Sequence, residues 1–245
     1  MLAPAEPQEV TTTTMQTHMR TRELPTSLHL ASGSDWLLLA GATGALGFVG
    51  VALVEGATRP GYDAWTHYVS ELSLSSYGWM QIANFIVCGL LIVAGAIGLR
   101  QHVGRGLGAG VGSGLIGLFG LGLVAAGLFV MDPTHGYPAD VASQGPPTWH
   151  GALHGLAGLI CFTSLGTAAL VLARRLSGGW TGYSFLTGLI VLGGFVGSLA
   201  SDVLGKLGAL PDAPTGLIQR IAIVAGWTWL ALLLLHVRAQ SHPEP

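Results

Sequence analysis

Six long apolar segments, separated by short polar connections, dominate the pattern of this chain. Each segment holds about 20 predominantly apolar residues, the length that a helix needs to cross a hydrocarbon core roughly 30 Å thick. The pattern therefore predicts an all-α fold, a polytopic transmembrane six-helix bundle over residues 35–238. The spans are expected at 35–56, 79–100, 110–131, 150–173, 183–204 and 217–237.

Composition supports a membrane protein and sets the ends of the bundle. Half of the residues, 50%, are hydrophobic and only 9% are charged. Residues 1–34 are polar and Thr-rich, without the basic start and apolar stretch of a secretory signal peptide, so they are expected to form a flexible N-terminal tail. Residues 239–245 form a short C-terminal tail. We expect a membrane lipid or a lipid-like small molecule as partner, and no nucleic acid.

The few basic residues predict the orientation in the membrane. Cytoplasmic loops carry an excess of Lys and Arg, which places both termini in the cytoplasm of a multi-pass cell-membrane protein. Acidic residues are concentrated in the opposite, outward-facing connections, so the functional site is expected on the outer side of the membrane. The arginines that set this orientation are Arg20, Arg22, Arg100, Arg105, Arg174, Arg175 and Arg238.

The first outward loop, GYDAWTHYVSEL at 61–72, is the richest polar segment. If residues 62–74 are helical, their spacing puts Asp63, His67, Ser70 and Glu71 on one stripe, with Trp65 largely on the other side. Such an interfacial segment would rest its aromatic side on lipid and turn its ionisable side to the bundle. The alternative is an interfacial anchor whose polar face meets water.

A histidine pair opens the fourth span. His150 and His154 are four residues apart and project from one helix face, as two ligands of one zinc ion do. His67, His135 or Asp132 could supply the third ligand. The motif lacks the glutamate of HExxH, and the two histidines could instead hydrogen-bond to loop carbonyls or carboxylates.

Two further polar residues open the sixth span. Gln219 and Arg220 stand in an otherwise apolar helix start, so they are expected to face the bundle or a water-filled cavity. Asp202 or Asp132 would be a suitable ion-pair partner for Arg220. Such an ion pair would simply tie two helix ends together. The alternative is a functional role, in which the guanidinium of Arg220 holds the phosphate or carboxylate head of a lipid.

Glycines recur inside the spans at the four-residue spacing that lets helix backbones approach closely in lipid. Helix packing is the expected role of such pairs. Examples are Gly110 and Gly114, Gly151 and Gly155, and Gly193 and Gly197.

Taken together, these motifs resemble a bacterial and archaeal membrane family called domain of unknown function 998. The resemblance rests on RPGYDAWTHYVSEL after the first span, DP closing the third, histidine opening the fourth and GLIQR opening the sixth. It covers about 36–238 and implies six helices in a membrane, but no assigned activity. A looser chemical similarity links Ser70, Asp132 and the histidines to membrane hydrolases such as alkaline ceramidases, which differ in helix number and histidine position.

Three functions follow as hypotheses. The first is a zinc-dependent intramembrane hydrolase acting on a lipid-like or isoprenoid molecule. The second is a metal-free cyclase in which burial raises the pKa of Glu71 and Asp132 so that they protonate an isoprenoid. The third is a non-enzymatic lipid-binding or accessory protein. The predicted site has catalytic Glu71, Asp132 and Ser70, substrate-binding Arg220, Asp63, Gln219, Trp65 and Trp149, and zinc ligands His150, His154 and His67.

Overall fold

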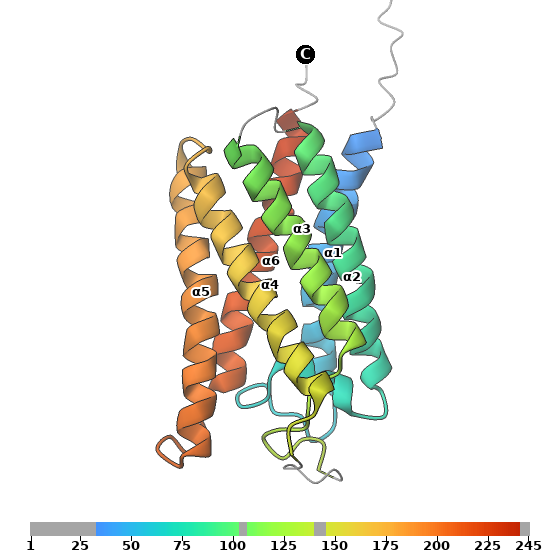
Figure 1. Cartoon of the computed structure of the whole chain (residues 1–245), viewed down its shortest axis with the longest axis vertical. Helices are drawn as coiled ribbons and strands as arrows, with labels where there is room; N and C mark the ends of the chain where they lie inside the picture. Colours follow the sequence, from blue (N-terminus) through green and yellow to red (C-terminus); the bar gives the residue numbers. More distant parts are fainter. Residues whose placement is uncertain (1–32, 103–106, 140–145, 241–245) are drawn as a thin grey trace, which may run out of the picture. The chain divides into compact units, whose positions relative to one another are not determined.

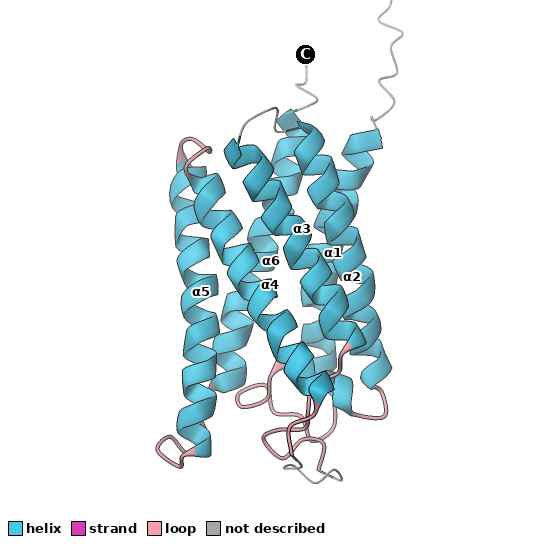
Figure 2. Ribbon diagram, in the orientation of Figure 1, coloured by secondary structure: helices cyan, strands magenta, loops and turns pink. Residues whose placement is uncertain are grey.

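The computed structural model describes residues 33–102, 107–139 and 146–240. Within these ranges the chain is helical, without a regular strand (Figure 2). The predicted tails, 1–34 and 239–245, lie almost wholly outside the described residues. The elements are α1 (Gly33–Thr58), the short 3-10 helix η1 (Val69–Leu74), α2 (Gly78–His102), α3 (Leu107–Leu128), α4 (Trp149–Ala173), α5 (Gly179–Lys206) and α6 (Thr215–Gln240).

The six α-helices are each long and apolar enough to cross a membrane. A helix satisfies its own backbone hydrogen bonds, which is what a segment without access to water requires. The predicted six-helix membrane fold is therefore confirmed, and the chain is an integral membrane protein.

The helices form a closed ring of neighbours (Figure 1). Each helix packs against the next one in the chain, from α1 to α6, and α6 packs against α1. The described parts of the connections, residues 59–77, 129–139, 146–148 and 207–214, gather at one end of the bundle, the lower end in Figure 1, which we call the site end. The start of α1 and the end of α6 mark the opposite terminal end.

The centre of the bundle is aromatic. Trp227 of α6 is 1% exposed, and three phenylalanines from three other helices surround its indole. The ring centroids of Phe48, Phe119 and Phe162 lie 5.5, 4.7 and 5.9 Å from that of Trp227. This cluster fixes α6 against α1, α3 and α4.

Glycines bring several helix backbones into direct contact. A Cβ on Gly41 of α1 would lie 2.6 Å from the Cα of Gly95 in α2, and a Cβ on Gly89 of α2 would lie 2.7 Å from the carbonyl oxygen of Gly120 in α3. At the α4–α5 contact, a Cβ on Gly188 would lie 2.9 Å from the carbonyl oxygen of Gly166. Small residues thus allow close packing where hydrophobic side chains gain little from leaving lipid.

The glycines at the predicted spacing are not those that make these contacts. A Cβ added to Gly114, Gly155 or Gly193 would meet nothing within 4 Å. Spacing along one helix does not say which face meets a neighbour, so that prediction was wrong for these three positions.

Candidate functional site

A tight turn in the connection between α3 and α4 presents His135. The backbone N–H of Tyr137 donates to the carbonyl of Thr134 at 3.1 Å, and the two central residues have positive φ, 52° at His135 and 75° at Gly136. Two positive φ values in succession are typical of a type I′ turn. Glycine adopts this conformation freely, and histidine is one of the few other residues that tolerate it.

Both ring nitrogens of His135 contact carboxylates from different parts of the chain. Nδ1 lies 2.8 Å from Oε1 of Glu71 in η1, and Nε2 lies 2.8 Å from Oδ1 of Asp202 in α5. Glu71 is 0% exposed and also accepts the backbone N–H of Tyr68 at 2.9 Å. The other oxygen of Asp202 accepts from Lys206 at 2.8 Å. We call Glu71, His135, Asp202 and Lys206 the polar clamp.

The two carboxylates keep His135 protonated. Burial by itself lowers the pKa of this imidazole, but the hydrogen bonds and negative charges of Asp202 and Glu71 outweigh burial and raise the pKa to about 9. Carboxylate oxygens only accept hydrogen bonds, so each ring nitrogen donates one. The clamp therefore joins η1, the α3–α4 connection and α5 through an imidazolium held between two anions.

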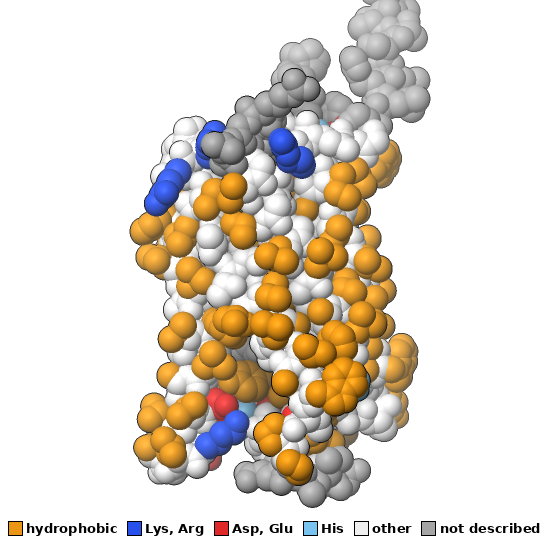
Figure 3. Space-filling model, viewed as in Figure 1, with side chains coloured by type: hydrophobic (Ala, Val, Ile, Leu, Met, Phe, Trp, Pro, Cys, Tyr) orange, Lys and Arg blue, Asp and Glu red, His pale blue; other side chains and the backbone are white. Residues whose placement is uncertain are grey.

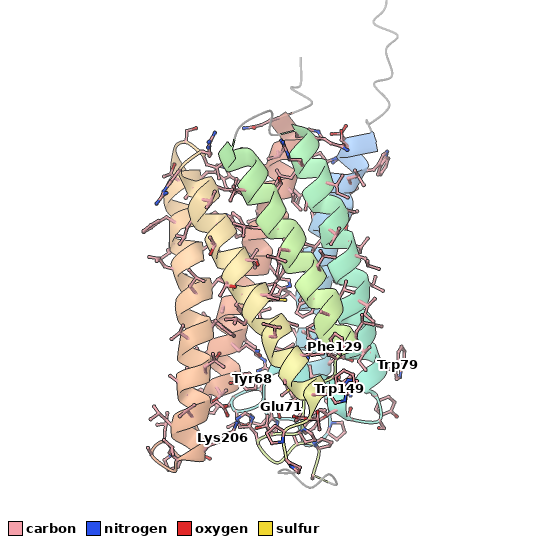
Figure 4. The ribbon with its side chains drawn as sticks, in the orientation of Figure 1. Tyr68, Glu71, Trp79, Phe129, Trp149 and Lys206 are labelled. Carbon is pink, nitrogen blue, oxygen red and sulfur yellow. The ribbon has the colours of Figure 1, made fainter. Side chains whose placement is uncertain are left out.

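Beside the clamp, α4 and α5 separate and leave a cleft of about 1060 Å³. Figure 3 shows this hollow near the site end, with acidic and basic side chains at its rim. Figure 4 shows Tyr68, Glu71 and Lys206 at that same end of the bundle. The cleft is lined in its apolar part by Leu159, Phe162, Phe195 and Leu199, and in its polar part by Tyr68, His135, Ser198, Asp202, Lys206 and Gln219.

The glycines of α4 account for the width of this α4–α5 cleft. Gly155 and Gly158 line it, and a Cβ on either would meet nothing within 4 Å. Further toward the terminal end, Gly166 and Gly188 bring the same two helices into contact. The pair of helices is thus closed at one end and open at the other.

The first loop folds differently from the predicted helix. Only 69–74 is helical, because side chains at 63–67 hydrogen-bond to nearby backbone and favour turns. Asp63 accepts from the backbone N–H of Trp65 and from the hydroxyl of Thr66, both at 3.0 Å, and its own N–H donates to Nδ1 of His67 at 2.9 Å. The Trp65 N–H, with the Thr66 hydroxyl, holds the pKa of the exposed Asp63 carboxyl below its ordinary value. Asp63 and His67 therefore organise this turn.

Arg220 holds the first loop to α6. Its Nη1 donates to the carbonyls of Ala64 and His67 at 2.7 and 2.9 Å, and its Nη2 donates to the hydroxyl of Tyr62. The ion pair expected with Asp202 or Asp132 is not formed, because the guanidinium of Arg220 already donates its hydrogen bonds to the first loop. Gln219 binds the same region, since its Oε1 accepts the backbone N–H of Val69 at 2.8 Å.

Asp132 ties the beginning of the α3–α4 connection to the start of α4. Its carboxylate accepts the hydroxyl of Thr148 at 2.6 Å and the backbone N–H of Thr148 at 2.9 Å. Thr148 in turn caps α4 by accepting the N–H of Gly151 at 3.0 Å. These bonds from Thr148 hold the pKa of Asp132 below its ordinary value, so the raised pKa expected for a cyclase acid was wrong at this residue. Glu71, in contrast, is buried as predicted.

The histidines predicted to bind zinc have separate partners. Nδ1 of His154 lies 3.1 and 2.8 Å from the carbonyl oxygens of Ala126 and Phe129, and His150 is exposed beside Trp149, with ring centroids 3.6 Å apart. Nε2 of His67 lies 3.3 Å from the carbonyl oxygen of His135. In the part of the chain that the structure describes, no three His, Cys, Asp or Glu side chains are arranged to hold a metal. The predicted set of His150, His154 and His67 therefore does not converge.

Of three other predicted site residues, one lines the cleft and two lie on the surface. Ser70 is 8% exposed and lines the cleft. Trp65 and Trp149 are 49% and 65% exposed, and neither lines it. Trp65 instead donates from Nε1 to the carbonyl of Asp212 at 2.8 Å, which ties the first loop to the α5–α6 connection.

Sequence reasoning did not predict the clamp as a unit. The sequence pattern indicates His135 only as a zinc ligand and Asp202 only as a partner of Arg220. One usable signal was the His-Gly pair at 135–136, which favours a turn with two positive φ values. Another was the spacing of Asp202 and Lys206, which puts opposite charges on one helix face.

Comparison with known proteins identifies a family but no characterised relative. A family model described as Protein of unknown function (DUF998) matches residues 42–236, nearly the whole bundle. The resemblance drawn from the sequence motifs is thereby confirmed. No curated protein and no solved structure matches the chain.

Proposed function

This chain belongs to the DUF998 family of proteins of unknown function, and we propose that it uses the family's helical fold to bind a lipid-like amphiphile in the α4–α5 cleft. The polar head would lie at the clamp and the apolar chain would lie between the two helices. The observation that carries this proposal is the change from charged to apolar lining along one cleft.

The size and surroundings of the cleft favour a ligand from the bilayer. Pockets for small molecules usually measure about 300–1,000 Å³, and this cleft, at about 1060 Å³, offers room for a head and a chain. The outward faces of α4 and α5 carry exposed apolar side chains, including Leu156 and Leu159 on α4 and Val196 and Leu199 on α5. A molecule dissolved in lipid could therefore enter sideways between the helices.

The charges at the polar end favour a head that both donates and accepts hydrogen bonds. The cations of His135 and Lys206 balance the anions of Glu71 and Asp202, so the clamp has little net charge to attract a simple ion. Lys206 is 54% exposed and can turn toward a ligand without breaking buried contacts. A zwitterionic or hydroxyl-rich head matches this arrangement.

We do not propose a zinc hydrolase or an acid-driven cyclase. His154 and His67 contact different backbone carbonyls and His150 lies against Trp149, so the three imidazoles share no ligand position. The low pKa of Asp132 makes its carboxyl a poor proton donor.

A glycine substitution tests the binding proposal. Gly155→Leu would place a side chain in the cleft, whereas the control Gly193→Leu places one on the exposed face of α5, where a Cβ is equally free. Each protein is reconstituted in phosphatidylcholine vesicles with a diazirine-bearing phosphatidylcholine, irradiated and mapped by mass spectrometry. We expect labelled peptides from α4 and α5 in the parent protein and the control, and at least fivefold less label in Gly155→Leu, since a filled cleft excludes the chain. Equal labelling of the two variants would refute the proposal.

We also propose that the site end faces outside the cell. Arg100, Arg174, Arg175 and Arg238 lie toward the terminal end, which the positive-inside rule assigns to the cytoplasm. Ser76 and Ser177 are exposed at opposite ends, while Cys88 and Cys161 are buried. A membrane-impermeant maleimide should label Ser76→Cys but not Ser177→Cys in intact cells, and the reverse result would invert the orientation.

A further inference from the structure

A second, smaller chamber continues the α4–α5 cleft into the middle of the bundle. It measures about 50 Å³ and shares Ser70, His154, Gly158, Phe162 and Gln219 with the lining of the cleft. Its remaining lining residues come from α1, α2, α3, α4, α6 and η1 and are mostly aromatic or aliphatic. They include Phe48, Phe85, Leu123, Ile223 and Trp227. This inner chamber has room for a group of a few heavy atoms.

Trp227, which lines the inner chamber, has a buried donor without a partner among the described residues. Trp227 is 1% exposed, and its Nε1–H makes no hydrogen bond within the described residues. Two residues along α6, Trp229 is equally buried, but its Nε1 donates to the hydroxyl of Ser184 at 2.9 Å. Buried polar groups are nearly always hydrogen-bonded, so the exception at Trp227 calls for a partner from outside the chain.

His154 lines the same chamber and has an acceptor nitrogen. Its Nδ1 faces two carbonyl oxygens, at 3.1 Å from Ala126 and 2.8 Å from Phe129, and therefore carries the proton that those bonds need. In the neutral ring, Nε2 then keeps a free lone pair. An apolar chamber with one donor and one acceptor suits a single oxygen function embedded in hydrocarbon.

We infer that the inner chamber binds a hydroxyl or carbonyl oxygen located in the apolar part of the ligand, with that oxygen accepting from the indole N–H of Trp227. This inference rests on the proposed function, because the chamber is reached through the α4–α5 cleft. It narrows the ligand from any lipid-like amphiphile to one that carries an oxygen along its chain or ring system.

The test uses fatty acids of one length as competitors of the diazirine-bearing phosphatidylcholine. One acid is saturated and plain, and the others carry a ketone at successive positions along the chain. We expect one ketone position, or two adjacent ones, to compete about fivefold better than the plain acid, because a hydrogen bond to a buried donor contributes roughly 1 kcal/mol.

A matched pair of replacements assigns this preference to one indole. Trp227 is replaced by benzothienylalanine, which keeps the shape of tryptophan but has sulfur in place of the N–H, and Trp229 is replaced in the same way as the control. The fivefold preference should disappear in the first protein and persist in the second. Trp227→Phe, read by the same ratio of competitors, provides a second variant, because a ratio is independent of how much protein folds.

The outcomes separate the inference from the proposal beneath it. If plain and ketone acids compete equally, the chamber binds no oxygen of the ligand, and if the preference survives loss of the Trp227 N–H, another group binds the ketone. Either result shows that the inference is wrong, while lipid binding stands. If neither acid competes and no label maps to α4 or α5, the proposed function fails and the inference fails with it.

Discussion

The contact between α4 and α5 is closed at one end and open at the other, and glycine occurs in both halves. Near the terminal end, Gly166 and Gly188 bring the two backbones together, whereas near the site end Gly155 and Gly158 leave a cleft. In the open half, the connection carrying His135 links to α5 through Asp202. Glycine therefore closes an interface only where the helix axes converge. Where they diverge, the polar clamp holds α5 in place of direct packing between the two helices.

The largest effect on stability is expected from a large side chain at a closed helix contact, and the contact between α2 and α3 provides the test. A leucine at Gly89 would meet the backbone of Gly120, which cannot yield as a flexible side chain can. We expect Gly89→Leu to lower the free energy of unfolding in detergent by about 3 kcal/mol or more, or to prevent folding, because overpacking against backbone leaves no room to relax. Thermal unfolding followed by circular dichroism measures this.

The matched control is Gly155→Leu, in the open half. It should unfold at or slightly above the temperature of the parent protein, since leucine favours helix more than glycine does. Similar destabilisation of both variants would show that the cleft is not open.

The next effect concerns the clamp. His135→Leu would remove the imidazolium between the carboxylates of Glu71 and Asp202 and leave Glu71 without a cationic partner, and His135 is only 16% exposed. Breaking a buried charge pair from one side costs about 3 kcal/mol. We expect a loss of that order, partly restored in the double variant His135→Leu with Glu71→Gln. The exposed His150 provides the control, and His150→Leu should change stability by less than about 0.5 kcal/mol.

Alkaline pH should weaken the same half of the interface. The pKa of His135 is raised from 6.5 to about 9, so its contribution is complete below about pH 6.5 and is lost as pH rises through about 9. The shift corresponds to up to about 3 kcal/mol. The unfolding temperature of the parent protein should therefore fall between about pH 7 and pH 10 more steeply than that of His135→Leu. Parallel curves for the two proteins would contradict the assignment.

The smallest effect is expected at the cap that fixes the start of α4. Thr148→Ala removes the side-chain acceptor for Gly151 and one of the two donors to Asp132. Loss of such a cap costs about 1 kcal/mol. Photolabelling of the cleft should fall only slightly, because the backbone N–H of Thr148 still binds Asp132. A loss of labelling as large as in Gly155→Leu would mean that the cap positions the wall of the cleft.

Periodicity and hydropathy were sufficient to predict the six helices and the gathering of polar loops at one end. They could not predict the polar clamp, because Glu71, His135 and Asp202 come from three separate elements that meet only in the folded chain. The spacing of His150 and His154 correctly put them on one helix, but their partners depend on the path of α3 and its connection. Arg220 is predicted to pair with a carboxylate, but it donates instead to backbone carbonyls of the first loop.

The binding of the first loop by α6 has a consequence for synthesis. The loop at 61–69 leaves the ribosome before α2 to α6, but Gln219 and Arg220, which hold its backbone, belong to α6. The contact between α6 and α1 that closes the ring is likewise made only once α6 has emerged. The first loop therefore completes its fold only after α6 has been synthesised, and a chain stopped after α5 would insert its helices yet lack an ordered site end.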